Sequence, residues 1–200
     1  MIDLLVVSAT AMESDLLRLH AEVLVTGVGA VNAACAVTRF LDRHEVSQIV
    51  VCGIGGAYRG SGLSIGDVLC AGSECYGDLG VASPEGFLDM EALGFPLLSG
   101  PLYNVLPLQI FPHARRAKFV TVNTCTGVDN LAAAMEQRTG GSVENMEGAA
   151  VVHTATLVGV PVGEIRGISN FTGNRDRNSW RVKEAAAGAQ AALIEWIRAL

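Results

Sequence analysis

Polar side chains capable of acid–base chemistry stand at the ends of apolar, strand-like runs. Glu13 and Asp15 follow the run at residues 2–7, Glu147 precedes a stretch of small apolar residues, and Asn170 ends the run that begins at Pro161. A carboxylate at the end of a buried strand costs desolvation energy, so it either balances the positive end of a helix dipole or works in a site. Taken one at a time, these residues leave both interpretations open.

Glycines gather at the same strand ends. The chain has 23 glycines in 200 residues, against a usual share of about 7%, and they cluster at residues 27–29 and 53–56. A glycine at a strand end lets the backbone turn sharply and approach a ligand closely, and open α/β sheets bind their ligands at this edge. Gly55 and Gly56 are therefore expected to lie beside a ligand.

The first glycine pair is only half of a dinucleotide-binding pattern. Gly27-Val28-Gly29 follows a strand and opens a helix, but Asn32 stands where the third glycine of that pattern belongs. The next strand ends in Cys52 and Gly53, without the acidic residue that binds a ribose. We therefore expect no nicotinamide cofactor, and two tight strand-to-helix turns explain these glycines.

Short apolar runs alternate with stretches of helical period along the chain. Strands are predicted at 2–7, 23–26, 48–52, 67–76, 119–122 and 161–168, and helices at 12–19, 31–43, 128–138, 146–158 and 179–200. This alternation predicts an α/β fold with a largely parallel central sheet. Residues 77–112 are rich in Gly and Pro and are expected to be irregular. Since no linker or repeat divides residues 1–200, one domain is expected.

Composition argues against several classes of protein. Fourteen basic and twenty acidic residues give a net charge of −6 with no basic cluster, so no nucleic-acid partner is expected. No apolar stretch approaches the ~20 residues of a membrane span, and Met1-Ile2-Asp3 lacks the basic start of a signal peptide, which indicates a cytoplasmic protein with no membrane partner. The five cysteines form no CxxC pair and the four histidines have no ligand spacing, so we expect buried thiols and no metal site.

Five short motifs, in this order, resemble the nucleoside phosphorylase and nucleosidase superfamily over nearly the whole chain. They are TGVG at 26–29, GIGGA at 53–57, IGDV at 65–68, NMEGAA at 145–150 and RGISN at 166–170. The resemblance implies a three-layer α/β fold without a cofactor. The closing stretch at 168–180, ISNFTGNRDRNSW, resembles that of the futalosine hydrolases within this superfamily. It implies an N-ribosidic hydrolase of the alternative menaquinone pathway.

This resemblance assigns roles to the candidate residues. Cleaving a purine N-glycosidic bond requires stabilisation of a cationic ribosyl centre, a nucleophile, and dispersal of charge on the purine. By analogy, Glu147 binds the ribose hydroxyls, Met146 packs against the sugar, and Glu13 activates water as a general base. Counting from the first strand selects Glu13, whereas matching the Ala11-Met12 pair selects Asp15. Further substrate contacts are expected from Gly55, Gly56 and Thr126.

The residue expected beside the base departs from the adenine-specific nucleosidases, which carry Asp where this chain has Asn170. An amide can donate hydrogen bonds to N7 and O6 of a 6-oxopurine, whereas a carboxylic acid suits adenine. We therefore expect Asn170 to contact a hypoxanthine base.

Other activities remain open at this point. Glu13 and Asp15 would repel phosphate, which favours water, but Arg59 and Arg166 could clamp an anion as in a purine nucleoside phosphorylase. A methylthioadenosine or adenosylhomocysteine nucleosidase is another alternative. A non-catalytic nucleoside sensor would need the glycine loops and Asn170 but not Glu13.

Futalosine carries a benzoate-bearing arm on its ribose, so the resemblance also implies an apolar slot that ends in a cation. The expected walls and cations are Phe171, Tyr58, Phe87 and Tyr103, with Arg175 or Arg177. A solvated loop with paired charges explains residues 174–177 equally well.

The expected partners are a small-molecule nucleoside, water and a second copy of the chain. Members of the superfamily pair their subunits beside the active site, and the apolar residues 97–111 could cover such an interface. A homodimer or a multiple of dimers is therefore expected.

Overall fold

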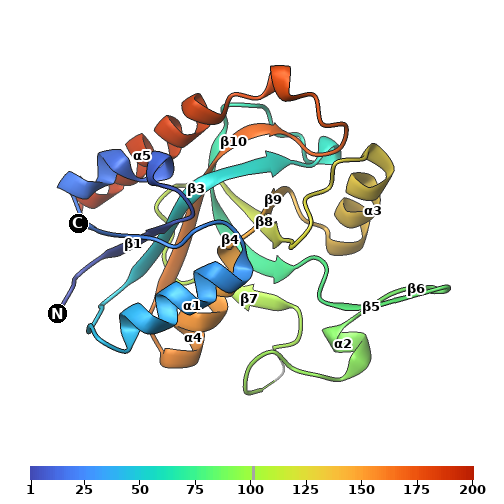
Figure 1. Cartoon of the computed structure of the whole chain (residues 1–200), viewed down its shortest axis with the longest axis horizontal. Helices are drawn as coiled ribbons and strands as arrows, with labels where there is room; N and C mark the ends of the chain where they lie inside the picture. The colour runs from blue at the N-terminus through green and yellow to red at the C-terminus, as the bar shows by residue number, and fades with distance from the viewer. Residues whose placement is uncertain (101) are drawn as a thin grey trace.

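The computed structural model describes residues 1–100 and 102–200. Their strands form one large mixed sheet, and helices pack around it (Figure 1). The strands of this sheet are β1 (Leu5–Ser8), β2 (Glu22–Val25), β3 (Ile49–Ala57), β4 (Val68–Tyr76), β7 (Val105–Pro107), β8 (Arg116–Thr121), β9 (Val143–Asn145) and β10 (Val162–Phe171). The helices are α1 (Ala30–Leu41), α2 (Met90–Leu93), α3 (Asp129–Thr139), α4 (Gly148–Val158) and α5 (Val182–Arg198).

Parallel pairing dominates the sheet, as the alternation of strands and helices predicts. Strands β2, β1, β3 and β10 run parallel in that order, and so do β4, β8 and β9. The antiparallel pairs β10–β4 and β3–β9 join the two groups. Strands β3, β10, β4, β8 and β9 therefore close into a ring, from which β1 and β2 extend. The sequence patterns do not predict this closure.

Helices cover both faces of the extended part, which confirms the three-layer architecture. On β1, Leu5 and Val7 belong to the core beneath α1 and α4, whereas Val6, and Leu4 just before the strand, belong to the core beneath α5. This division follows from the two-residue period of a strand. Figure 1 shows α5 on one side of β1 and β3, and α1 with α4 on the other.

Helix α5 lies close to β10 because Gly167 has no side chain. A Cβ at Gly167 would collide with the backbone of Ala185 in α5. This contact fixes the helix against the strand whose last residues reach the candidate site.

Several predicted elements differ in their bounds. The helix predicted at 12–19 forms two 3-10 helices, Ala11–Glu13 and Asp15–Leu19, because Ser14 between them has a non-helical backbone and its hydroxyl accepts from that of Ser8 (2.7 Å). The helices predicted from 146 and 179 begin at Gly148 and Val182.

The segment 77–112 is more ordered than its composition indicates. It contains α2, β7 and a two-stranded hairpin of β5 (Gly80–Ser83) and β6 (Gly86–Asp89) that projects from the body of the molecule (Figure 1). Strands of four residues are too short to produce a detectable period. In the part of the chain that the structure describes, no helix has the length and hydropathy needed to cross a membrane.

The prediction of buried thiols holds for Cys52, Cys70 and Cys75 but is wrong for Cys35. Cys35 lies on α1, whose outer face is exposed, so its helical apolar pattern did not imply burial. Cys125, which follows β8, is also exposed.

Candidate active site

A cavity of about 260 Å³ opens where β1, β3 and β10 end and where β9 leads into α4. It lies at the edge of the sheet that the glycine clusters indicate. All nine predicted site residues line it: Glu13, Gly55, Gly56, Thr126, Met146, Glu147, Asn170, Phe171 and Arg175.

Glu13 is held rigidly at one side of the cavity. Its Oε2 accepts hydrogen bonds from the backbone N–H (2.9 Å) and the hydroxyl (2.7 Å) of Thr10, and its Oε1 accepts from the N–H of Ile54 (3.0 Å). The side chain is almost fully buried although it lines the cavity. Since all three partners donate, the carboxylate is held as a hydrogen-bond acceptor.

Asp15, the alternative to Glu13, lies outside the cavity lining. Its side chain is 61% exposed and faces Arg18 at 3.4 Å. Ser14 separates the two short 3-10 helices, so Glu13 and Asp15 belong to different turns and different surroundings.

Glu147 lies at the start of α4, and the first glycine loop binds it. Its Oε1 accepts from the N–H of Gly29 (2.9 Å), and its Oε2 lies 3.5 Å from Nη2 of Arg166. Gly29 has a φ of +101°, a conformation that favours glycine. The loop Gly27-Val28-Gly29 therefore positions a carboxylate in addition to turning the chain from β2 into α1.

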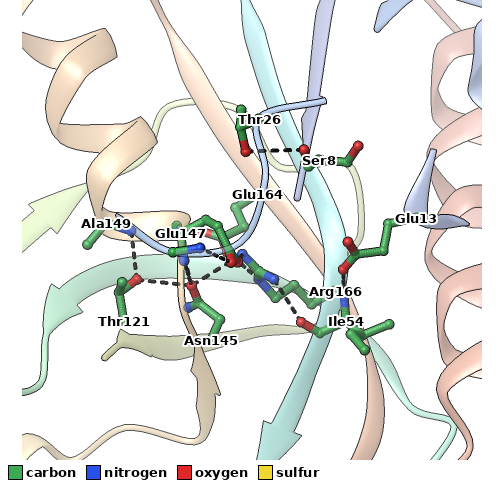
Figure 2. A network of polar contacts seen from close by, with 12 residues as sticks. Ser8, Glu13, Thr26, Ile54, Thr121, Asn145, Glu147, Ala149, Glu164 and Arg166 are labelled. Atoms are coloured by element: carbon green, nitrogen blue, oxygen red, sulfur yellow. Dashed lines mark hydrogen bonds and ion pairs between the residues drawn. The ribbon is translucent and has the colours of Figure 1, made fainter. Parts of the chain in front are cut away.

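Arg166 lies between the carboxylates of Glu13 and Glu147, as Figure 2 shows. Its Nε donates to Oε1 of Glu164 (2.6 Å) and its Nη1 to the carbonyl of Ile54 (2.7 Å). Burial opposes its charge, but the carboxylates of Glu164 and Glu147 raise the pKa of Arg166 above its ordinary value.

The narrow space around Arg166 depends on Gly53. A Cβ there would lie 2.8 Å from Oε1 of Glu13 and 2.9 Å from Nη1 of Arg166. Both distances are shorter than real Cβ atoms show, so a larger residue here would displace the carboxylate of Glu13 or the guanidinium of Arg166.

Asn145 joins this cluster to the start of α4. Its Oδ1 accepts from the N–H groups of Glu147 (3.0 Å) and Gly148 (2.7 Å) and from Nη2 of Arg166 (3.2 Å). Because the free N–H groups of a helix start need acceptors, this side chain also orients Glu147. Figure 2 shows Asn145 beside Thr121, whose hydroxyl donates to it.

Asn170 presents its amide to the cavity from the end of β10. Its Oδ1 accepts from the hydroxyl of Ser169 (2.7 Å), and its Nδ2 donates to the carbonyl of Phe171 (2.9 Å). An amide nitrogen carries two protons, and the second has no partner among the described residues. These two hydrogen bonds orient the amide and leave one of its N–H groups available to a ligand.

Comparison with known proteins identifies the family. The family model described as "Phosphorylase superfamily" matches residues 19–200. The futalosine hydrolase of Thermus thermophilus is 36% identical over 183 residues, which cover 85% of this chain and 78% of that protein. The corresponding enzyme of Streptomyces coelicolor is 34% identical over 180 residues, covering 86% of this chain and 76% of that protein.

The chain belongs to the futalosine hydrolase family of the phosphorylase superfamily.

Solved structures support the same fold. A methylthioadenosine/S-adenosylhomocysteine nucleosidase from Neisseria meningitidis, in complex with methylthio-immucillin-A, superposes with a TM-score of 0.83 at 19% identity, and each chain is covered completely. The corresponding nucleosidase from Streptococcus pneumoniae gives a TM-score of 0.82, also at 19% identity, with 99% of each chain covered. At this identity the likeness establishes the fold alone.

Not every residue expected around the arm of a futalosine hydrolase substrate lies at the cavity. Tyr58 is fully buried and donates its hydroxyl to Oε2 of Glu144 (3.0 Å), Phe87 lies in the projecting hairpin beneath Arg138, and Tyr103 and Arg177 are outside the lining. The expectation is wrong for Tyr58, Phe87 and Tyr103, because the apolar character of a side chain does not reveal which part of the fold it enters. Of the two alternative cations, Arg175 lines the cavity.

Sequence reasoning missed Glu144 and Trp180, which both line the cavity of this family member. Glu144 accepts from the N–H (2.9 Å) and the hydroxyl (2.6 Å) of Thr126 and so fixes that loop. Trp180 lies 5.5 Å from the guanidinium of Arg175. The signal for Trp180 was its place in the closing motif.

Proposed function

We propose that this protein hydrolyses the N-ribosidic bond of futalosine, releasing hypoxanthine and dehypoxanthine futalosine. One observation carries the proposal: Glu13, Glu147 and Asn170 meet in one cavity of a chain that is 36% identical to a futalosine hydrolase. These side chains supply a general base, a negative charge for the sugar and a donor for the purine, which are the three requirements of the reaction.

The proposed reaction begins with a water molecule beside Glu13. Its carboxylate accepts a proton from the water as the oxygen attacks the anomeric carbon, and the electrons of the breaking C–N bond pass to the purine. Glu147 accepts hydrogen bonds from the ribose hydroxyls and places its negative charge close to the developing cation, while Met146 packs against the sugar. Asn170 donates a hydrogen bond to the departing base, and solvent provides the proton that the base finally gains.

Water is a better nucleophile for this site than phosphate, because Arg166, the cation at the centre of the site, is already paired with carboxylates. Arg166 contacts Glu164 and Glu147, so it has little attraction left for a phosphate dianion. Arg59 is largely exposed and lies 3.8 Å from Asp129. These pairings disfavour the phosphorylase alternative.

The substrate arm is proposed to pass Phe171 and Trp180 and to end at Arg175. These three side chains line the cavity beyond Asn170. An aromatic wall suits an aryl group, and a guanidinium held beside an indole ring suits a carboxylate. Gly55, Gly56 and Thr126 would contact the nucleoside between Glu13 and this arm.

We also propose that the protein forms a homodimer or a multiple of dimers. Only part of the apolar segment 97–111 is free to cover an interface between subunits. Leu98, Leu106 and Leu108 pack into the protein's own core. Light scattering after size-exclusion chromatography tests this proposal, and a monomeric mass would contradict it.

Turnover of futalosine, inosine and methylthioadenosine, each with and without phosphate, tests the function. We expect release of hypoxanthine from futalosine in phosphate-free buffer, with free sugar as the other product. Release only in phosphate, giving a sugar phosphate, would favour a phosphorylase. Binding without release of base would favour a sensor, and preferential cleavage of methylthioadenosine would overturn the assignment of substrate.

A further inference from the structure

Two fully buried carboxylates that the proposed reaction does not use lie beneath the candidate site. Glu74 projects from β4 and Glu164 from β10. Both reach the space beside Gly148, the first residue of α4, where a Cβ would collide with Oε1 of Glu74 and both carboxylate oxygens of Glu164. Glycine at this position therefore makes room for two acidic side chains to face each other.

The hydrogen bonds around the pair do not account for all its oxygens. Glu74 accepts from Nδ2 of Asn145 (2.5 Å) and from the N–H of Cys75 (3.0 Å). Its Oε2 also lies 3.2 Å from the hydroxyl of Thr121, whose single proton is shared with Oδ1 of Asn145. Oε1 of Glu164 accepts from Arg166, but its Oε2 is the buried side-chain atom left without a partner among the described residues. A buried oxygen without a hydrogen-bond donor is destabilising, and more so when it carries charge.

A count of charges leads to the same conclusion. Arg166 is the positive charge of this buried cluster, and it already contacts Glu164 and Glu147 and lies close to Glu13. A fourth ionised carboxylate on Glu74 would have no cation of its own, and a buried charge without a partner is neutralised by taking up a proton.

We propose that Glu74 and Glu164 share one proton, with Glu74 as the acid that donates to Oε2 of Glu164, and that this pair holds Arg166 in place between Glu13 and Glu147. The proton supplies the missing donor for the orphaned oxygen and removes the surplus negative charge. Burial and the neighbouring Glu164 also raise the pKa of Glu74 well above its ordinary value. Both glutamates are positioning residues, and this part of the proposal rests on the proposed function.

Infrared spectroscopy tests the shared proton without reference to activity. At neutral pH exposed carboxylates are ionised, so a C=O stretching band of a protonated carboxylic acid that shifts in D₂O reports a buried acid. We expect this band in the unmodified protein and in the control Glu195→Gln, which removes an exposed carboxylate, and we expect its loss in Glu74→Gln. Absence of the band from the unmodified protein, or its persistence in Glu74→Gln, would overturn the acid pair.

Kinetics test the positioning role. Glu164→Gln removes the closest charge from Arg166 and lets the guanidinium neutralise Glu147, so kcat should fall by about tenfold or more with a smaller change in KM. Glu74→Gln keeps a donor toward Glu164 and should lower kcat less. Equal losses in the two variants, with the same melting temperature as the unmodified protein, would contradict this role. If no nucleoside is turned over, the proposed function fails, while the infrared band still decides whether the acid pair exists.

Discussion

Glu13 and Asp15 are two residues apart, yet their surroundings differ. Three backbone and hydroxyl donors hold Glu13 at the cavity, whereas Asp15 faces solvent beside Arg18. A general base must be held within reach of the proton that it abstracts, and a mobile exposed side chain cannot meet this requirement.

Glu13→Gln and Glu147→Gln should each lower kcat by at least about 100-fold, because they remove the base and the charge beside the ribosyl cation. Asp15→Asn should leave kcat close to that of the unmodified protein. Steady-state release of hypoxanthine measures these effects, and circular dichroism checks that the fold persists. An active Glu13→Gln together with an inactive Asp15→Asn would reverse the assignment.

Asn170→Asp should change the preference for the base. The new carboxylate would face O6 of a 6-oxopurine, acceptor against acceptor, at a cost of about 1–3 kcal/mol, which corresponds to roughly a 10- to 100-fold loss. A 6-amino analogue should lose less, since its amino group donates to the new carboxylate. The measurement is the ratio of kcat/KM for the 6-oxo and 6-amino nucleosides. If the substitution leaves that ratio unchanged, Asn170 does not contact the base.

The sequence predicts site residues best where a local motif fixes their surroundings. Glu147 and Asn170 lie in short motifs that end strands or begin a helix, and both line the cavity. The pairing of Arg166 with Glu164 also had a local signal, because residues two apart on a strand share a face. Tyr58 had none: its contact with Glu144 joins residues 86 positions apart.

Among the elements, β10 depends on glycines to approach its neighbours. Gly167→Ala should lower the free energy of unfolding by about 1–3 kcal/mol or more, because the new methyl group meets backbone atoms of Ala185, which cannot rotate away as a side chain could. Gly72→Ala is the matched control within β4, since its Cβ would lie 3.6 Å from the nearest atom, an ordinary contact. Urea denaturation measures both variants, and equal stability would show that α5 can move away from β10.

Strands and helices with long, regular patterns were predictable, and their ends were not. The helix predicted at 146–158 begins two residues later because Asn145 accepts from the N–H groups of Glu147 and Gly148 and holds the preceding residues outside the helix. Closure of the ring through β9 was unpredictable for another reason. This strand has only three residues, and its pairing with β3 connects distant parts of the chain.

For the whole molecule, the buried acid pair couples stability to pH. The unfolded chain releases the proton of Glu74 near its ordinary pKa, roughly pH 4.5, whereas the folded protein retains it because its pKa is raised. The folded state then binds more protons, so the stabilisation present below that pH is lost as pH rises toward the folded-state value, with a slope approaching about 1.4 kcal/mol per pH unit.

Glu74→Gln should remove this dependence. Urea denaturation between about pH 5 and 8 gives the unfolding free energy of both proteins. As pH rises, the unmodified protein should lose stability steadily relative to the variant. Taking the difference cancels the titration of all other groups. Parallel curves for the two proteins would mean that Glu74 is ionised in the folded state.

Two thiols are exposed, Cys125 at the cavity and Cys35 on α1. Their relative rates of alkylation can therefore report whether a ligand occupies the cavity. Partial burial at the cavity and nearby carboxylates raise the pKa of Cys125, so its alkylation should be slow, but a nucleoside that fills the cavity should slow it further. Cys35 lies outside the cavity lining and should react at the same rate with or without the nucleoside. The ratio of label at the two sites, read by mass spectrometry of peptides, would therefore report binding even in variants that no longer cleave their substrate.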